Sequence, residues 1–311
     1  MIVNKANLAP LFTGIKLTFN NALERAPATW EKIAMKVPST GKSEEYKWLS
    51  SFPAMKKWVG EKAVKSLAAH KYTIVNDDWE ATVEVDRNDI EDDQTGQYAI
   101  QAKAAGLSAG MLPDEIVYDL VNLGFERPCY DGQYFFDTDH PVGNLSVSNK
   151  GTKQLSIDTL AKARASFGAA RTQMRKVKDE DGRPLKIRPN ILLVPVALED
   201  VARTLMTADR LEDGKVNIYK GTAEVVVSEE IQSDTQWFLL DTSKPVMPFI
   251  YQERKAPVLV EQTSLENDDV FMRKKFKFGA EARAAGGYAF WQLAYGSTGR
   301  KNNAGHYYRQ S

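Results

Sequence analysis

Apolar and polar residues alternate near the start of the chain, where Ile15, Leu17 and Phe19 are each separated by one polar residue. A period of two is typical of a strand or an extended arm, and a helical start is expected over residues 19–26. Residues 1 to about 33 hold too few apolar side chains to form a core alone. We therefore expect an N-terminal arm that packs on another part of the protein.

The strongest helical pattern lies in residues 86–125. It predicts a helix over about 88–111, roughly 36 Å long. Its small residues allow close packing, and the acidic residues of its first turn complement the helix dipole. Pro113 is expected to begin a second helix at its first position, and Gly124 is expected to cap the end of that helix.

Strand and helix signals alternate in the following part of the chain, which predicts an α/β module. A helix is expected over residues 155–176, with Ser156 as its N-cap, and another over residues 198–209. Runs of apolar and β-branched residues bounded by turn residues predict the strands. The expected strands lie at 72–86, 191–198, 222–231, 237–242 and 256–296, the last of them ending with residues 288–295.

Composition narrows the classes of function. Lys+Arg and Asp+Glu both number 41, so the formal net charge is zero. This balance argues against a dedicated nucleic-acid binder, which carries a basic excess. The single cysteine, Cys129, has no partner for an internal disulfide, so a cytosolic product is expected. The sequence lacks a signal-peptide core and any run of ~20 apolar residues, so no membrane association is expected.

Two neighbouring segments differ in the sign of their charge. Residues 42–71 hold seven lysines and three glutamates, and they belong to a long excursion predicted over residues 34–75. Residues 77–93 hold nine acidic residues and one basic residue. The two segments can pair within one chain or between copies, and a head-to-tail contact between copies builds rings or shells. The excursion also carries aromatic side chains that can anchor a partner, namely Trp48, Phe52 and Trp58.

The sequence "FFDTDHPVG", residues 135–143, is the strongest candidate for chemistry, because Asp137, Asp139 and His140 are residue types found in metal sites and acid–base pairs. The chain lacks H-E-x-x-H and paired cysteines, so nothing completes a zinc shell. Aspartates and a residue before proline also favour a turn in which side chains hold backbone amides. We therefore prefer a structural turn and expect no metal and no catalytic residue. A metal-dependent hydrolase that uses these three residues is the alternative.

Four segments carry a resemblance to a known family, and the resemblance covers nearly the whole chain, from about residue 8 to 298: "VDRNDIEDDQTGQY", "LPDEIVYDLVNLGF", "YDGQYFFDTDHPVG" and "GAEARAAGGYAFWQLAYGS". In this order they resemble the major head subunits of Mu-like phages and prophages, which are tailed-phage capsid proteins of the Hong Kong 97 (HK-97) type. "FFDTDHPVG" and "WQLAYGS" are the specific motifs. The resemblance implies an α+β fold of the HK-97 type and a structural role rather than an enzymatic one.

The resemblance also implies hexamers and pentamers that form an icosahedral phage head around double-stranded DNA. The expected location is the virion, after assembly in the bacterial cytoplasm. An encapsulin-like compartment is a further alternative with the same fold. The implied regions are an N-arm (1–33), an extended E-loop (34–75), a P domain (76–152) with a spine helix at about 88–111, an α/β A domain (153–250), return strands of the P domain (251–298) and a C-terminal tail (299–311).

Copies of the chain itself are the main expected partners. The resemblance adds a separate scaffold protein, a portal, decoration proteins and weak, non-specific contact with packaged DNA. No cofactor is expected. The charge pattern predicts a contact between the basic excursion of one subunit and the acidic helix start of the next. The expected contact residues are Trp48, Phe52, Lys56, Lys57, Trp58 and Lys62 on one side, and Asp89, Glu91, Asp92 and Asp93 on the other.

Overall fold

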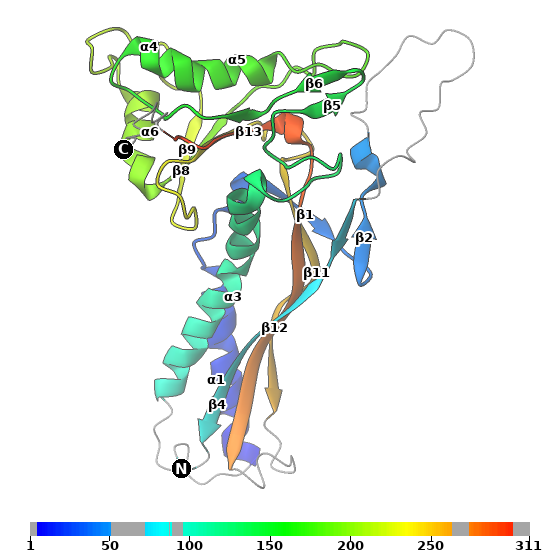
Figure 1. The fold of residues 1–311 in the computed structure, drawn as a ribbon. Helices are drawn as coiled ribbons and strands as arrows, with labels where there is room; N and C mark the ends of the chain where they lie inside the picture. The colour runs from blue at the N-terminus through cyan, green and yellow to red at the C-terminus, as the bar shows by residue number, and fades with distance from the viewer. Residues whose placement is uncertain (1–4, 51–71, 87, 89–95, 263–273, 301–311) are drawn as a thin grey trace, which may run out of the picture.

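The protein has an elongated lower half and a broader upper half (Figure 1). The computed structural model describes residues 5–50, 72–86, 88, 96–262 and 274–300. Long strands and two helices make up the lower half. A second sheet with shorter helices makes up the upper half.

A four-stranded sheet with the order β1-β11-β12-β4 forms the lower half. Strand β1 runs parallel to β11, and the other pairs are antiparallel. Strand β4 lies at a free edge of this sheet and carries several acidic residues, which discourage edge-to-edge pairing of sheets. The strands are β1 (Ala34–Pro38), β4 (Asp77–Asp86), β11 (Phe249–Gln262) and β12 (Lys275–Tyr288).

A five-stranded sheet with the order β7-β13-β10-β8-β9 forms the upper half. Its central strands β8 and β10 are fully buried, as their continuous apolar sequences predict. The helices of this half are α4 (Leu160–Ala163), a π-helical turn at Arg164–Gly168, α5 (Ala169–Arg175) and α6 (Glu199–Thr207). The strands are β7 (Lys150–Gly151), β8 (Ile191–Pro195), β9 (Glu224–Ser228), β10 (Trp237–Leu240) and β13 (Ala294–Ser297).

Two small hairpins and several single turns complete the described chain. Strand β2 (Ser43–Glu45) pairs with β3 (Thr73–Val75), and β5 (His140–Val142) pairs with β6 (Leu145–Val147). The 3₁₀ turns are η1 (Trp30–Lys32), η2 (Lys47–Ser50), η3 (Leu123–Phe125), η5 (Val196–Leu198) and η6 (Trp291–Leu293).

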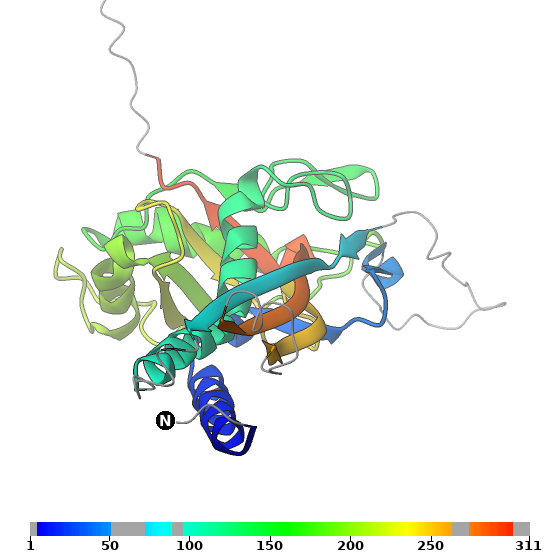
Figure 2. The ribbon, with the colours of Figure 1, turned by 90° about the horizontal axis from the view of Figure 1, so that it is seen from below.

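The N-terminal segment is a helix, α1 (Lys5–Glu24), so the prediction of an extended arm is wrong. Its buried residues Phe12, Ile15, Phe19 and Ala22 recur every three or four positions, while Leu17 is 59% exposed. The helical period thus outweighs the short alternation around Leu17. As expected, the segment packs on the rest of the protein, since α1 lies beside the long helix in both views (Figures 1 and 2).

The long helix α3 runs from Gly96 to Asn122 without a break, so the predicted second start at Pro113 is wrong. A proline inside a helix removes one backbone hydrogen bond. Here Pro113 is buried, and packing on both sides of it holds the helix together. Gly124 is not a left-handed cap, because its φ is not positive. A Cβ at this position would instead meet the Phe136 ring at 2.6 Å, so close packing explains the glycine.

Two further boundaries differ from the prediction. Thr159, rather than Ser156, caps the helix at residue 160, because its hydroxyl oxygen accepts a 3.2 Å hydrogen bond from the backbone N–H of Lys162. The predicted last strand at 288–295 is divided by η6, and β13 then joins β10 in the upper sheet. Residues 34–38, at the start of the predicted excursion, form β1 and pair with β11 in the lower sheet.

Candidate interaction site: an acidic groove beside the long helix

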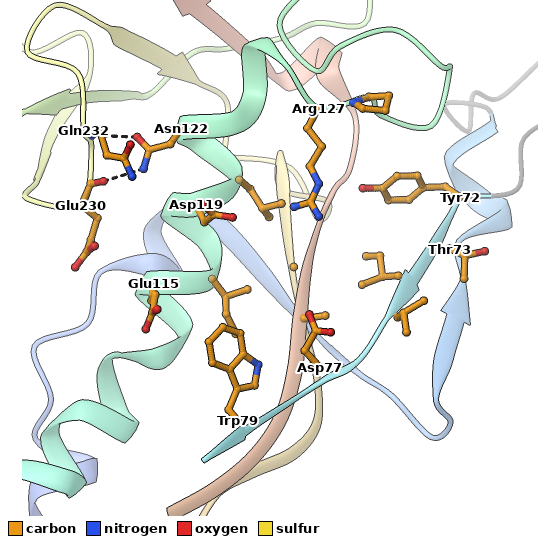
Figure 3. A pocket seen from close by; sticks show the side chains of 17 residues that line it. Tyr72, Thr73, Asp77, Trp79, Glu115, Asp119, Asn122, Arg127, Glu230 and Gln232 are labelled. Carbon is orange, nitrogen blue, oxygen red and sulfur yellow. Dashed lines mark hydrogen bonds between the residues drawn. The ribbon is translucent and has the colours of Figure 1, made fainter. Parts of the chain in front are cut away.

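A groove of about 870 Å³ separates the C-terminal half of α3 from strands β3 and β4 (Figure 3). Four exposed carboxylates line it, together with a single basic residue, Arg127. Four acids against one base give a net charge of −3 for the lining. The carboxylates are those of Asp77, Glu115, Asp119 and Glu230.

Glu115 and Asp119 are four residues apart, so they lie on the same face of α3. Like charges at this spacing weaken a helix slightly. The apolar residues Ile116 and Leu120 occupy the adjoining face and pack against β12. A Cβ at Gly286 would come within 2.8 Å of both side chains, so the glycine lets the helix approach the strand.

Two tyrosines connect the walls of the groove. The hydroxyl of Tyr72 accepts a 2.8 Å hydrogen bond from the backbone N–H of Tyr288. The hydroxyl of Tyr288 in turn donates to the carbonyl of Leu120 on α3 at 2.8 Å. Burial raises the pKa of both phenols, so both stay neutral. The base of the β2–β3 hairpin is thereby fixed relative to the long helix.

Asn122, at the end of α3, positions the segment around Glu230 that forms the third wall of the groove. The side-chain amide of Asn122 donates to the carbonyl of Glu230 at 2.9 Å, and its oxygen accepts from the backbone N–H of Gln232 at 3.1 Å (Figure 3). These two bonds hold the segment that carries the Glu230 side chain. The Arg127 side chain points into the groove from the top in Figure 3, and within the described residues no ion pair is recorded for it.

Among the predicted contact residues, the structure describes Trp48. This residue is 37% exposed, and its ring meets those of Tyr46 and Phe290 at 6.0 and 5.7 Å. It therefore belongs in part to the body of the protein. The other predicted contact residues, Phe52, Lys56, Lys57, Trp58, Lys62, Asp89, Glu91, Asp92 and Asp93, lie outside the described residues.

The "FFDTDHPVG" residues do not converge on a common point. Asp137 holds backbone, as expected for a turn, because its carboxylate accepts from the N–H groups of Thr138 at 2.8 Å and Tyr134 at 3.3 Å. Asp139 is exposed. His140 is fully buried and stacks on Trp291, with ring centroids 4.1 Å apart. The alternative of a hydrolase built on these three residues is therefore not supported.

The structure gives His140 partners that sequence reasoning missed. Its Nδ1 lies 2.7 Å from Oδ2 of Asp131, and the Cys129 thiol donates to Oδ1 of the same carboxylate at 3.1 Å. Burial and the neighbouring carboxylate raise the pKa of the Cys129 thiol, which keeps the thiol protonated beside the Asp131 carboxylate. Burial alone would raise the pKa of Asp131, but the hydrogen bond and charge of His140 lower it. The signal for this trio is the spacing Cys-x-Asp-x8-His.

None of the helices within the described ranges has both the length and the apolar character that a membrane span requires.

A family model described as "Mu-like prophage major head subunit gpT" matches residues 8–161, 151–231 and 228–309. The chain is 34% identical to the major capsid protein of Escherichia phage Mu over 294 residues, which cover 94% of this chain and 74% of that protein. It is 32% identical to the Mu-like prophage FluMu major head subunit of Haemophilus influenzae over 300 residues, which cover 95% of this chain and 76% of the relative.

Solved structures show the same fold. The procapsid of bacteriophage JBD30 matches with a TM-score of 0.60 and 30% identity over 97% of this chain and 78% of that chain. The JBD30 capsid decorated with minor capsid protein trimers matches with a TM-score of 0.59 and 29% identity over 75% of this chain and 100% of that chain. A virus-like particle from Pyrococcus furiosus shares the fold alone, with a TM-score of 0.54 and 12% identity over 92% of this chain and 98% of that chain.

The HK-97-type α+β fold and the structural role are therefore confirmed, and neither the hydrolase nor the encapsulin-like alternative finds support. This chain belongs to the Mu-like prophage major head subunit family and is a structural major capsid protein of the phage virion, not an enzyme.

Proposed function

We infer that copies of this chain form the hexamers and pentamers of an icosahedral head through a head-to-tail contact between opposite charges. In this contact, residues 51–71 of one subunit lie on the acidic face of the next. The segment carries five lysines and one glutamate, a net charge of +4. Charge complementarity of this kind steers association and fixes its register.

The acidic groove supports this proposal, because it extends the acceptor surface beyond the helix start. The groove has a net charge of −3, and the edge strand β4 continues from it with exposed Asp78, Glu80 and Glu84, of which Asp78 pairs with Arg283 and Glu84 with Lys275 in the same subunit. In the sequence, Asp89, Glu91, Asp92 and Asp93 follow before α3. We propose that these acidic residues together make an acceptor for a basic segment.

We also propose for this chain the region names that the resemblance implies. Residues 1–33 form the N-arm and 34–75 the E-loop, with β1 anchoring the E-loop in the body. Residues 76–152 and 251–298 contribute the P domain, with α3 as its spine helix. Residues 153–250 form the A domain, to whose sheet β7 and β13 add one strand each. Residues 299–311 form the tail.

We also propose partners beyond the chain itself. A scaffold protein and a portal would act during assembly, and decoration proteins would bind the finished shell, as the minor capsid protein trimers do on the JBD30 capsid. The balanced charge of 41 basic and 41 acidic residues suits a container whose inner wall contacts double-stranded DNA only weakly.

Electron microscopy of a charge-reversed variant tests the assembly contact. The variant Lys56→Glu/Lys57→Glu/Lys62→Glu should stay folded by circular dichroism and form no shells in negative stain. A matched control, Lys153→Glu/Lys176→Glu/Lys178→Glu, changes the net charge equally at exposed residues that form no side-chain ion pair with another described residue. This control should assemble. Normal shells from the first variant would contradict the proposed contact.

A further inference from the structure

Three ligand-type side chains meet in the core beneath the hairpin β5–β6. The ligand atoms of Cys129, Asp131 and His140 all lie within 4.8 Å of one another. The side chains of Asp131 and His140 are 5% and 0% exposed, and Cys129 is 6% exposed. A tight turn that contains Gly132, with φ at +87°, presents Cys129 and Asp131 on one side.

The protonation of His140 follows from its second contact. The Asn149 side-chain oxygen lies 3.2 Å from Nε2 of His140, and it also accepts from the backbone N–H of Asp137 at 2.9 Å. The orientation of this amide is fixed, because its nitrogen donates to three carbonyls. These carbonyls belong to Phe135, Trp291 and Ala294, at 2.8, 3.3 and 3.2 Å. Nε2 must therefore carry a hydrogen.

Nδ1 of His140 consequently faces a carboxylate oxygen of Asp131 at only 2.7 Å. Two lone pairs at this distance repel each other, so a hydrogen lies between the two atoms. A metal ion can take the place of this hydrogen if the two side chains move apart, because tetrahedral zinc holds nitrogen and oxygen ligands roughly 3.3 Å from each other. Buried charges in proteins are paired with one another or coordinate metals.

We propose that Cys129, Asp131 and His140 form a binding site for a zinc-type divalent cation. Sulfur, imidazole nitrogen and carboxylate oxygen are the donor types that zinc takes from proteins, and a water can occupy the fourth position. Asn149 supplies the outer contact that metal-binding histidines commonly have, because it accepts the N–H of the opposite ring nitrogen.

The charge balance of the cluster favours the replacement of two protons by a divalent cation. With two protons, the cluster holds a neutral thiol, a carboxylate and an imidazolium, so its net charge is zero. When a divalent cation enters, the thiol proton and the Nδ1 proton leave together. The cluster then holds a thiolate, a carboxylate, a neutral imidazole and the cation, and its net charge is again zero. The buried site thus takes up the ion without gaining a charge.

The site differs from the one that the sequence suggested. Asp137 and Asp139 take no part, because Asp137 is engaged by backbone N–H groups and Asp139 is exposed. The ion would join the turn at residues 129–133 to the start of β5. Because the ligands come together only in the folded chain, binding would stabilise the folded state.

Cobalt substitution of the full-length chain tests the site. The protein is purified, incubated with Co²⁺ alone and dialysed, and its absorption spectrum is recorded. One equivalent of retained cobalt and a thiolate-to-cobalt charge-transfer band are expected. The variant Cys129→Ala should lose the band and bind at least tenfold more weakly. The control Asp139→Asn changes a neighbouring exposed carboxylate and should behave as the wild type.

A second measurement does not depend on the folding of a variant. Zn²⁺ should raise the thermal unfolding midpoint of the wild-type chain, and EDTA should reverse the rise. The proposal is overturned if the wild type retains no metal after dialysis and its unfolding midpoint does not respond to Zn²⁺. It is also overturned if the charge-transfer band persists in folded Cys129→Ala.

Discussion

Asp114 on the long helix accepts a 2.7 Å hydrogen bond from the backbone N–H of Trp30, which lies 84 residues earlier in the chain. The same carboxylate accepts from the N–H of Thr29 at 2.9 Å. Asp114 is 3% exposed, so no water is available to replace it. One side chain thereby fixes the point at which the N-terminal segment leaves α3 and enters β1.

The substitution Asp114→Ala should lower the free energy of unfolding by about 1–3 kcal/mol for each backbone N–H left unpaired. Urea unfolding of the unassembled chain measures the change. Asp119→Ala is the matched control on the same helix, since Asp119 is exposed, and a change within about 0.5 kcal/mol is expected there. Equal losses in the two variants would show that Asp114 does not hold the turn.

Replacement of two helical glycines by alanine should change the free energy of unfolding in opposite directions. A Cβ at Gly14 on α1 meets nothing within 4 Å, so Gly14→Ala should stabilise the protein by up to about 1 kcal/mol. A Cβ at Gly106 on α3 would collide with the carbonyl of Phe19 and lie 2.9 Å from the Ala22 Cβ. Gly106→Ala should therefore cost about 1–3 kcal/mol. Thermal unfolding of both variants checks the order, and stabilisation by Gly106→Ala would contradict the close crossing of the helices.

Reversal of the groove charges should impair assembly but not folding. Glu115 and Asp119 are exposed, and no hydrogen bond of their side chains is recorded in the described part of the chain, so Glu115→Lys/Asp119→Lys should fold normally. Shell yield, measured by sedimentation, should fall at least tenfold. The reversal Asp200→Lys/Asp234→Lys, at exposed acids that do not line the groove, is the control.

A combined variant distinguishes a direct contact between the two charged surfaces from other causes of lost assembly. Chains that carry both the groove reversal and Lys56→Glu/Lys57→Glu/Lys62→Glu exchange the two signs, and they should regain part of the shell yield. Rescue of this kind requires that the two surfaces meet. If the combined variant assembles no better than either parent, the groove is not the acceptor.

Assembly of the wild type should become slower as salt is added, because the proposed contact joins opposite charges at the surface. The Debye length falls from about 10 Å at 0.1 M to about 3 Å at 1 M ionic strength. Light scattering during assembly at several salt concentrations measures the rate. The hydrophobic part of the interface gains strength in salts such as sulfate, so sodium chloride is the appropriate salt. A rate independent of sodium chloride would exclude the charge contact.

The apolar pattern predicted β8, β10 and β12, and it predicted β11 only from residue 256 onward, whereas this strand begins at Phe249. The pattern failed where tertiary packing opposed a local signal. A proline is common at the first position of a helix. Pro113 instead lies inside α3, because the packing of α3 on β12 stabilises the helix around it. Ile15 and Phe19 fit both a strand and a helix, and only Phe12 and Ala22 extend the pattern to a helical period.

The candidate site was harder to predict, because its residues are separated in sequence. Nothing in the sequence marked the position of Glu115 opposite Asp77 across a groove. The close approach of α3 to β12 depends on Gly286, because a side chain at this position would collide with Ile116 and Leu120 of α3. His140 was recognised, but Asp131 and Cys129, nine and eleven residues away, became its neighbours only through the turn at Gly132.

The chain passes between the two sheets three times: from β4 through α3 to β7, from β10 to β11, and from β12 through η6 to β13. The sheets are thus joined by covalent backbone at three points as well as by side-chain packing. A load that pulls one half of the subunit away from the other must stretch the main chain at each crossing. The two halves of a subunit are therefore held together by peptide bonds, which do not yield under loads that separate non-covalent contacts.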